Sequence, residues 1–269
     1  MRTSVIVSTY NEARQLDLVL EGLARQTSAP SEVFVADDGS GDETRELLEG
    51  WRARAPWPLE HVWHEDNGFR KWSISNEAIR RSTGDWLLFL DGDAVPHGRW
   101  IEDHVAASSW GEVLCGRRVK LGPKFTPEVD RTLVRSGRLE RLLGPVTRSG
   151  LRGDSTRVGL GVRLPAPVAR LLHPRPRKLM GVNFSVSRVA FEAVNGWDEE
   201  WPGRRGDRDL DLRLLRSGAK FAALLNRAIV YHLHHFERPN SQAIQQRVRD
   251  EEASERVRAR SGLVDERPR

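Results

Sequence analysis

The stretch Trp86-Leu87-Leu88-Phe89-Leu90-Asp91-Gly92-Asp93 decides the fold class of this chain. Its five leading residues are all apolar, which is typical of a strand covered on both faces, as in the parallel sheet of an α/β protein. Ligands of such sheets bind beyond the carboxyl ends of the strands, where the two aspartates stand. Two carboxylates at this spacing repel each other. A bound Mg²⁺ or Mn²⁺ relieves the repulsion and typically also bridges to a phosphate oxygen. The alternative is a plain tight turn, because Asp-Gly is common in turns.

Composition excludes several classes of protein. With 38% hydrophobic and 30% charged residues, the 269-residue chain resembles an ordinary soluble protein. No apolar run approaches the roughly 18 residues that a membrane-spanning helix needs. The chain opens directly into a strand-like segment at 3–9, with no signal-peptide pattern, so we expect a cytoplasmic protein. The single cysteine, Cys115, lies in an apolar segment and is expected to be a buried structural thiol.

Positive charge is concentrated in one region. Residues 117–178 hold 16 Lys and Arg against 4 Asp and Glu, so this region should attract anions. The candidate partners are an anionic acceptor or an anionic membrane, with peripheral attachment to the inner face. Nucleic acid is not expected, since no helix-turn-helix, zinc-finger or RNP-like pattern is present. The alternative is an ordinary solvated surface, because arginine is abundant throughout the chain.

The first half of the chain alternates strand-like and helix-like segments, which indicates βαβ units. Strands are predicted at 3–9, 31–37, 59–64, 85–91 and 112–119. Helices are predicted at 12–26, 42–54, 72–82 and 98–108. In the first helix, Leu16, Val19, Leu20 and Leu23 form an apolar stripe at helical spacing. We therefore predict an α/β nucleotide-binding part over residues 1–119.

The second half divides into three parts. Residues 120–178 have weak periodicity and scattered Gly and Pro, which predicts a basic loop-and-helix insertion. Residues 179–240 are expected to complete the same domain: order returns at 180–187, followed by helices at 189–194 and 207–217 and a strand at 228–232. Residues 241–269 are expected to form a charged helix up to about 260 and a fraying tail.

Three predicted strand ends carry polar motifs. They are Ser8-Thr9-Tyr10-Asn11-Glu12, Ala36-Asp37-Asp38-Gly39-Ser40-Gly41-Asp42 and the Asp91-Gly92-Asp93 tripeptide. Together they resemble the nucleotide-sugar-binding half of inverting GT-A glycosyltransferases of the family 2 type. The later motifs 181–185, 195–199 and 206–210 are similar to the galactosyltransferase-type part of chondroitin-polymerase-like bacterial enzymes. The resemblance covers nearly the whole chain except the basic insertion, and it implies a GT-A fold with helices on both faces of a mixed sheet.

The resemblance implies a set of residues that bind the nucleotide sugar. They are Thr9, Tyr10, Asn11, Glu12, Asp37, Asp38, Phe69, Arg70, Lys71, Asn76, Asp91, Gly92, Gly181 and Asn183. One carboxylate of Asp37 and Asp38 would accept a hydrogen bond from uracil N3–H, and which one remains open. Arg70 or Lys71 would neutralise diphosphate charge, in place of an arginine that family members often carry just before Asn76. The alternative for the aspartates is that they cap turns.

The resemblance also implies a metal site and a catalytic base. Asp93, with Asp91 and a histidine from His232, His234 and His235, would hold Mn²⁺ or Mg²⁺; His232 is favoured and His235 is the second candidate. Asp207 is the candidate base and Asp209 the fallback. The family's acidic pair reads Gly206-Asp207 here, so the first acid is missing. The alternative for Asp207 is a carboxylate that caps the following helix.

These features predict a metal-dependent inverting glycosyltransferase. It would move a sugar from a nucleotide diphosphate donor, with UDP as the favoured nucleotide, to a hydroxyl of a glycan or glycolipid. Gly181 and Asn183 would border the donor sugar, and Trp197 would either face a sugar or lie in the core. Two other classes compete. A nucleotidyltransferase generally needs a glycine-rich phosphate loop that 8–12 lacks, and the missing acid at Gly206 leaves a non-catalytic carbohydrate- or nucleotide-binding module as a second alternative.

Overall fold

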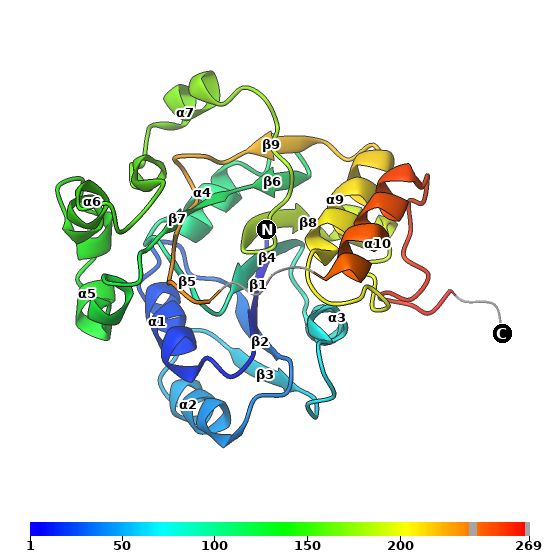
Figure 1. Cartoon of the computed structure of the whole chain (residues 1–269), viewed down its shortest axis with the longest axis horizontal. Helices are drawn as coiled ribbons and strands as arrows, with labels where there is room; N and C mark the ends of the chain where they lie inside the picture. Colours follow the sequence, from blue (N-terminus) through cyan, green and yellow to red (C-terminus); the bar gives the residue numbers. More distant parts are fainter. Residues whose placement is uncertain (237–240, 267–269) are drawn as a thin grey trace.

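The structure is a computed structural model that describes residues 1–236 and 241–266. A seven-stranded sheet in the order β3-β2-β1-β4-β8-β6-β9 forms its centre, and a three-stranded sheet in the order β5-β10-β7 lies beside it (Figure 1). The strands are β1 (Thr3–Thr9), β2 (Glu32–Asp37), β3 (Leu59–Trp63), β4 (Trp86–Asp91), β5 (Ala94–Pro96), β6 (Val113–Cys115), β7 (Arg117–Lys120), β8 (Asn183–Ser187), β9 (Phe221–Ala223) and β10 (Ile229–His232). The predicted mixed α/β architecture is confirmed.

Helices cover both faces of the large sheet. They are α1 (Ala13–Ala24), α2 (Asp42–Arg52), α3 (Lys71–Arg81), α4 (Trp100–Ala106), α5 (Arg131–Arg135), α6 (Pro145–Leu151), α7 (Ala166–Leu172), α8 (Arg188–Ala193), α9 (Gly206–Arg216) and α10 (Gln242–Ala253). Three short 3-10 turns lie at Thr126–Glu128, Arg138–Glu140 and Val158–Gly161. No helix among the described residues is long and apolar enough to cross a membrane.

Side chains of the central strands point alternately to the two faces of the sheet, and each face has its own hydrophobic core. In β4, Leu88 and Leu90 join the core under α1, α2 and α4, whereas Leu87 and Phe89 join the core under α3, α8 and α9. Successive side chains of a strand point to opposite faces, so a strand that is apolar at every position supplies both cores. This is the physical reason why the apolar run of residues 86–90 predicted a sheet with helices on both sides.

The segment expected as one strand at 112–119 is instead two strands in two sheets. It breaks at Gly116, whose backbone N–H donates to Asn183 O at 3.0 Å. A Cβ at this glycine would lie 2.3 Å from Asn183 Nδ2, so only glycine fits there. β6 pairs with β8 and β9, while β7 pairs in parallel with β10. The short strands β5 and β9 were not predicted.

The C-terminal helix is shorter than expected and the chain beyond it is packed rather than frayed. α10 ends at Ala253, and the following segment returns to the turn after α8. There Ala259 N donates to Val194 O at 3.1 Å, and Leu263 N donates to Asn195 O at 3.1 Å. The ends of two predicted parts, 237–240 and 267–269, lie outside the described residues. The predicted basic insertion contains α5, α6 and α7 joined by turns, which matches the loop-and-helix expectation.

Burial of His104 makes stability depend on pH. Its ring is fully buried and lies 2.8 Å from Ser185 Oγ, and burial lowers its pKa from 6.5 to about 3. In the unfolded chain this histidine is protonated below about pH 6.5, whereas in the folded protein it stays neutral down to about pH 3. The free energy of unfolding therefore falls as the pH drops from about 6.5 to about 3. At about pH 5 the loss from this group is about 2 kcal/mol.

Urea denaturation of the wild type and of His104→Gln checks this prediction. Between about pH 7.5 and about pH 5, the wild type should lose about 2 kcal/mol more free energy of unfolding than the variant. Equal losses would show that His104 is not the group responsible.

Candidate active site

Strand register brings the predicted polar motifs to one edge of the large sheet. β1 pairs in parallel with β4 and β2, placing Ser8 opposite Asp91 and Thr9 opposite Asp37. Gly92 N donates to Ser8 O at 2.7 Å, and a Cβ at Gly92 would lie 3.0 Å from that oxygen. The glycine thus allows the ends of β1 and β4 to approach closely. Asp91 and Asp93 consequently lie at the same edge of the sheet as the motif at 8–12.

Asp93 and two histidines form a compact group of potential metal ligands. Asp93 Oδ2 lies 3.3 Å from His232 Nε2 and 3.2 Å from His235 Nε2. The ligand atoms of the three residues all lie within 4.8 Å of one another. The other carboxylate oxygen of Asp93 is buried and has no hydrogen-bond partner among the described residues. A buried oxygen with no partner beside two imidazole nitrogens is a donor set that fits a divalent ion, and imidazole suits Mn²⁺ better than Mg²⁺.

The small sheet brings the histidines to this place. β10 runs antiparallel to β5, with His232 opposite Ala94, and Leu233 N donates to Asp93 O at 2.9 Å. Burial and the neighbouring Arg118 guanidinium lower the pKa of His232 to about 3, so its ring is neutral, and its Nε2 accepts a hydrogen bond from Arg118 Nη1 at 3.2 Å. His234 is different, because its backbone N–H bonds Thr126 Oγ1 and its side chain is exposed.

Asp91 pairs with a lysine rather than joining the three-residue group. Lys71 Nζ donates to Asp91 Oδ1 at 2.6 Å, and the lysine lies at the first position of α3. Although burial opposes charge on Lys71, Asp91, Asp93 and Asp207 together raise its pKa. Lys71 is therefore a cation held amid three acids at the edge of the sheet.

Asp207 occupies the first turn of α9, and its carboxylate is close to Gly181. Gly181 N donates to Asp207 Oδ2 at 3.3 Å. Burial raises the pKa of this carboxyl, against the lowering effects of the Gly181 N–H and Lys71. A raised pKa makes a carboxylate a better proton acceptor. The structure thus brings together Asp207, Lys71 and Asp91 from three distant segments.

Trp72 explains the glycine that replaces the family's first acid. A Cβ at Gly206 would lie 2.6 Å from Cε2 of the Trp72 indole, so a larger residue does not fit in this packing. The indole N–H of Trp72 donates to Gly203 O at 2.8 Å. Lys71 Nζ lies 5.5 Å from the Trp72 ring centroid. Trp72 was not among the predicted site residues; its position next to Lys71 was the available signal.

Three predicted site residues have their polar groups engaged within the protein. Asp209 is fully buried and pairs with Arg213 at 2.6 Å and Arg256 at 2.7 Å, so it is not available as the fallback base. Asn76 bonds the backbone of Trp197 through both amide atoms. Asn183 is equally buried, and its amide joins the sheets instead of facing a sugar.

Asn183 and Trp197 both serve the interior of the protein. The Asn183 amide donates to Arg117 O and Ala228 O and accepts from the Trp100 indole at 2.9 Å. Trp197 lies in the core, with its ring centroid 4.7 Å from that of Trp72. Of the two interpretations of Trp197, the core one therefore holds. Cys115 is buried as expected, and burial raises its pKa to about 12.

The two aspartates after β2 have different environments. Asp37 is fully buried, and its carboxylate accepts from Ser40 N at 2.9 Å and contacts His61 Nε2 at 2.8 Å. Asp38 is buried but keeps 6% of its surface exposed, contacts His64 Nε2 at 2.8 Å and accepts from Arg70 N at 3.0 Å. Asp37 thus closes the turn, while Asp38 connects it to the loop before α3. Neither histidine was among the predicted site residues.

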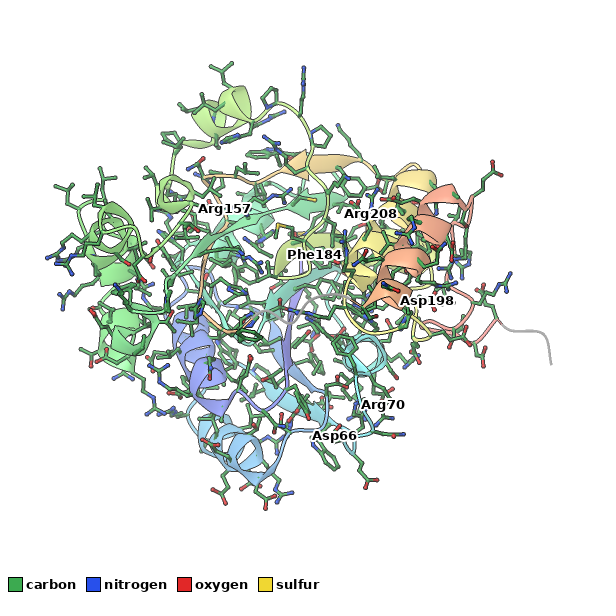
Figure 2. All side chains as sticks on the ribbon, in the orientation of Figure 1. Asp66, Arg70, Arg157, Phe184, Asp198 and Arg208 are labelled. Carbon is green, nitrogen blue, oxygen red and sulfur yellow. The ribbon has the colours of Figure 1, made fainter. Side chains whose placement is uncertain are left out.

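Exposed aromatic rings surround this turn. Tyr10 is 46% exposed, and its hydroxyl donates to Asp66 Oδ2 at 2.8 Å. Phe69 is 45% exposed and packs edge-on against Trp72. Asp66 and Arg70 lie close together below α3 in Figure 2, and the Arg70 guanidinium bonds the backbone of this loop. The rings of Tyr10 and Phe69 are therefore open to a flat ligand near Asp38.

The remaining residues of the first motif anchor its backbone. Asn11 adopts a left-handed conformation with φ of 50°, and its side chain accepts from Gly41 N at 3.1 Å. Thr9 is buried, with its hydroxyl unpaired among the described residues. Burial raises the pKa of Glu12, and the nearby Asp91 adds to this effect. Glu12 thus belongs to the acidic edge, whereas Asn11 fixes the turn.

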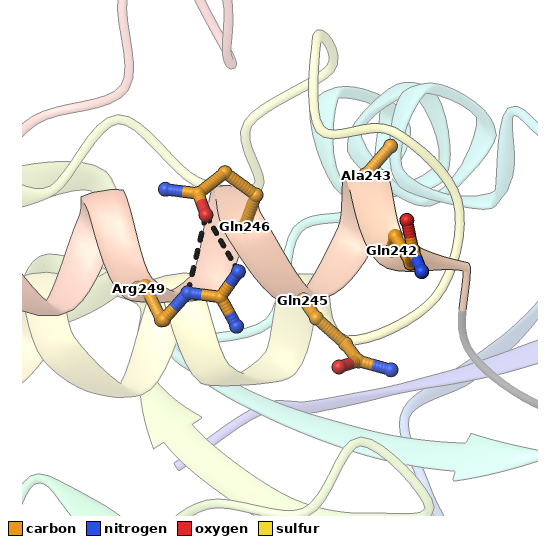
Figure 3. A pocket seen from close by; sticks show the side chains of 5 residues that line it. All are labelled: Gln242, Ala243, Gln245, Gln246 and Arg249. Carbon is orange, nitrogen blue, oxygen red and sulfur yellow. Dashed lines mark hydrogen bonds between the residues drawn. The ribbon is translucent and has the colours of Figure 1, made fainter.

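Two hollows lie on the surface of the described residues, and one of them adjoins the site. One of about 340 Å³ lies beside the Asp93 group and is lined by residues 120–123, Asp154, Thr156 and residues 232–236. The other, of about 490 Å³, follows one side of α10 and is lined by Gln242, Ala243, Gln245, Gln246 and Arg249 (Figure 3). Only the first includes a residue of the Asp93 group.

Solved structures share the fold of this chain. The S. aureus TarS fragment 1–349 in complex with UDP aligns with 98% of this chain and 68% of its own, with a TM-score of 0.62 and 18% identity. The mannosyltransferase PcManGT from Pyrobaculum calidifontis, in complex with GDP-Man and Mn²⁺, aligns with 86% of this chain and 56% of its own at a TM-score of 0.50 and 19% identity. At this identity the likeness establishes the fold, which is GT-A.

The fold and the sequence together define the class as a glycosyltransferase. The model of the family described as "Glycosyl transferase family 2" matches residues 4–156, more than half of the chain, so this chain belongs to that family.

Three relatives align with part of the chain. Validoxylamine A glucosyltransferase from Streptomyces hygroscopicus subsp. limoneus is 38% identical over 106 residues, covering 39% of this chain and 23% of the relative. Glycosyltransferase AglE from Haloferax volcanii is 38% identical over 120 residues, covering 44% and 39%. Chondroitin synthase from Pasteurella multocida is 30% identical over 103 residues, covering 38% and 10%. The aligned part is thus less than half the length of each relative.

The structural roles of Asp207 and Asp209 differ, and stability measurements should separate them. Asp209→Asn breaks a buried ion pair and leaves Arg213 uncompensated, so we expect a loss of about 3 kcal/mol in the free energy of unfolding. Asp207→Asn removes a carboxyl whose charged form is penalised by burial, so stability should stay the same or rise slightly. Urea denaturation near neutral pH measures both. Similar losses in the two variants would mean that Asp207 is a structural cap.

Proposed function

We propose that this glycosyltransferase transfers a sugar from a UDP-linked donor with inversion at the anomeric carbon, and that it depends on a divalent ion. The observation that carries the proposal is the convergence of Asp93, Lys71 and Asp207 at one sheet edge. The acceptor is a hydroxyl of a glycan or glycolipid. The UDP-bound and UDP-GlcNAc-bound TarS structures support the choice of donor by their likeness in fold.

Asp93, His232 and His235 are the proposed ligands of the ion, and Mn²⁺ fits them best. Bound there, the ion would stabilise negative charge on the departing diphosphate. Asp91 is the last residue of β4, and its carboxylate accepts a hydrogen bond from Lys71. We therefore place Asp91 next to the diphosphate, where it orients the lysine, instead of among the direct ligands.

Lys71 is the proposed counter-charge for the diphosphate. Its ammonium group lies amid Asp91, Asp93 and Asp207 and stays protonated because these acids raise its pKa. As the glycosidic bond breaks, negative charge grows on the leaving phosphate oxygen, and a cation fixed at this edge lowers its energy. The Arg70 side chain bonds its own loop, so Lys71 is the better substitute for the family's arginine.

Asp207 is the proposed base. The acceptor hydroxyl attacks the anomeric carbon opposite the diphosphate, its oxygen forms the new bond, and its proton passes to Asp207 as the old bond breaks. Gly181 positions the carboxylate through its N–H and brings backbone close to the donor sugar. Since Asp207 must be deprotonated, activity should fall as the pH drops through its pKa, which burial raises above 3.8.

The nucleoside is proposed to bind between the first motif and the loop before α3. Tyr10 and Phe69 offer exposed rings, and Asp38 retains slight exposure next to them. We assign the contact with uracil N3–H to Asp38 because the Asp37 carboxylate is fully buried and closes its own turn. Thr9, Asn11 and Glu12 shape the adjoining backbone.

The hollow beside the Asp93 group is the proposed entry for the acceptor. Lys120 and His234 line it, while the acidic side chain of Asp154 is occupied by Lys124 N and Phe125 N. Part of this wall comes from residues 117–178, which hold 16 Lys and Arg against 4 Asp and Glu, and this excess favours an acceptor that carries negative charge.

Loss of the base is the test of the reaction. With UDP-sugars, acceptor and Mn²⁺, Asp207→Asn should lower kcat by about 10² to 10⁴-fold with little change in donor binding. Glu102→Gln is the matched control, because Glu102 also lies in the first turn of a helix, α4, pairs there with Arg99 and is not among the predicted site residues, and it should keep full activity. Released UDP and transferred sugar are measured together. Full transfer by Asp207→Asn would refute the base assignment, and pyrophosphate release would indicate a nucleotidyltransferase.

Metal binding can be tested without turnover. Calorimetric titration of Mn²⁺ should show that Asp93→Asn and His235→Ala weaken binding by more than about tenfold, since even indirect partners of a metal commonly contribute that much. His234→Ala is the control: this histidine is adjacent in sequence but lies outside the three-residue group. Equal weakening by His234→Ala, or no uptake by the wild type with UDP present, would contradict the proposed site.

A further inference from the structure

The outward side of α6 combines exposed leucines with arginines. Leu143 and Leu151 are each 85% exposed, and Leu142 is 63% exposed. In Figure 1, α5 and α6 stand at the margin of the molecule, away from α3 and α9. Large apolar side chains that are exposed together are costly in water and often mark an interaction site. The proposed catalytic site does not account for these exposed leucines, which lie outside it.

The arrangement of α6 is amphipathic. Val146 and Ser149 are buried and face the protein, whereas Arg148, Leu151 and Arg152 share the opposite, exposed side at helical spacing. Ser149 Oγ donates to Asp154 Oδ2 at 3.1 Å, which attaches the inward side to the segment that lines the hollow beside Asp93. The helix is therefore fixed to the protein by one side, and its other side is left to solvent.

The charge around the leucines is positive and largely uncompensated. Arg138, Arg141, Arg148 and Arg152 are exposed, and across residues 1–236 and 241–266 their side chains make no hydrogen bond or ion pair. Nearby Arg131 and Arg135 differ, because they pair with Asp17 and Glu21. The one acid within 138–152, Glu140, already pairs with Arg25. Four guanidinium groups without a partner among the described residues thus lie in the same segment, 138–152, as the three exposed leucines.

We propose that this α6 surface, made of Leu142, Leu143, Leu151, Arg141, Arg148 and Arg152, attaches the protein peripherally to a bilayer rich in anionic lipid. Leucines enter the boundary between headgroups and acyl chains, while arginines bind the lipid phosphates. An anionic polysaccharide would use the arginines but would leave the leucines in water. The proposal stands independently of glycosyl transfer, because none of these residues belongs to the proposed catalytic site.

Sedimentation with vesicles tests the proposal on the full chain. The protein should bind phosphatidylglycerol–phosphatidylcholine vesicles, bind pure phosphatidylcholine poorly, and be released by salt. Arg148→Gln with Arg152→Gln should weaken partitioning by about 25-fold, at about fivefold per arginine. Leu143→Ser with Leu151→Ser should weaken it by about tenfold or more. All four residues are exposed, and thermal melting confirms that the variants fold.

A matched control and two contrary results complete the test. Val189→Ser with Arg52→Gln changes an exposed apolar residue and an exposed arginine on other helices, and should bind as the wild type does. Equal partitioning to both vesicle types, or unchanged binding by either α6 double variant, would overturn the proposal. So would a self-association in the ultracentrifuge that the leucine variant abolishes while vesicle binding persists, because the surface would then join two copies of the chain.

Discussion

The pairing of β10 with β5 is the constraint on which the site depends. β5 follows Asp93 directly, and the antiparallel register puts His232 opposite Ala94. Without this pairing, Asp93 would be a buried carboxylate with no nitrogen ligands nearby, since its two histidine neighbours come from the far end of the chain. The small sheet in turn depends on the break at Gly116, because β7 must leave the large sheet to pair with β10. The pairing of β10 with β5 and β7 thus brings the histidine nitrogens next to the Asp93 carboxylate.

Much of the fold could be predicted because its signals are local. The apolar strand at 86–90 and the helical stripe from Leu16 to Leu23 each report burial directly, and both are found where expected. The split at Gly116 could not be read from the sequence, because its cause is the Asn183 side chain, far along the chain. The same holds for the packed segment after α10, whose bonds to Val194 and Asn195 hold it without a helix.

The positions of the site residues could be predicted from the sequence, but the roles of their side chains could not. Positions at strand ends could be placed from the sequence, because parallel strands bring their carboxyl ends to one edge. Whether a polar side chain faces a ligand or serves the protein depends on distant partners. Asp209 meets Arg256, and Asn76 meets Trp197, so both are engaged internally. Trp72 likewise explains Gly206 only in three dimensions, where the indole fills the space that a side chain would need.

The central claim is that a divalent ion held by Asp93 and the two histidines joins the protein to the donor's diphosphate. Its most direct test is the melting temperature of the protein with UDP alone, with Mn²⁺ alone and with both, since ligands that bind the folded state raise apparent stability. The account predicts a shift with both ligands that exceeds the sum of the separate shifts. An equal UDP shift with and without Mn²⁺ would contradict it.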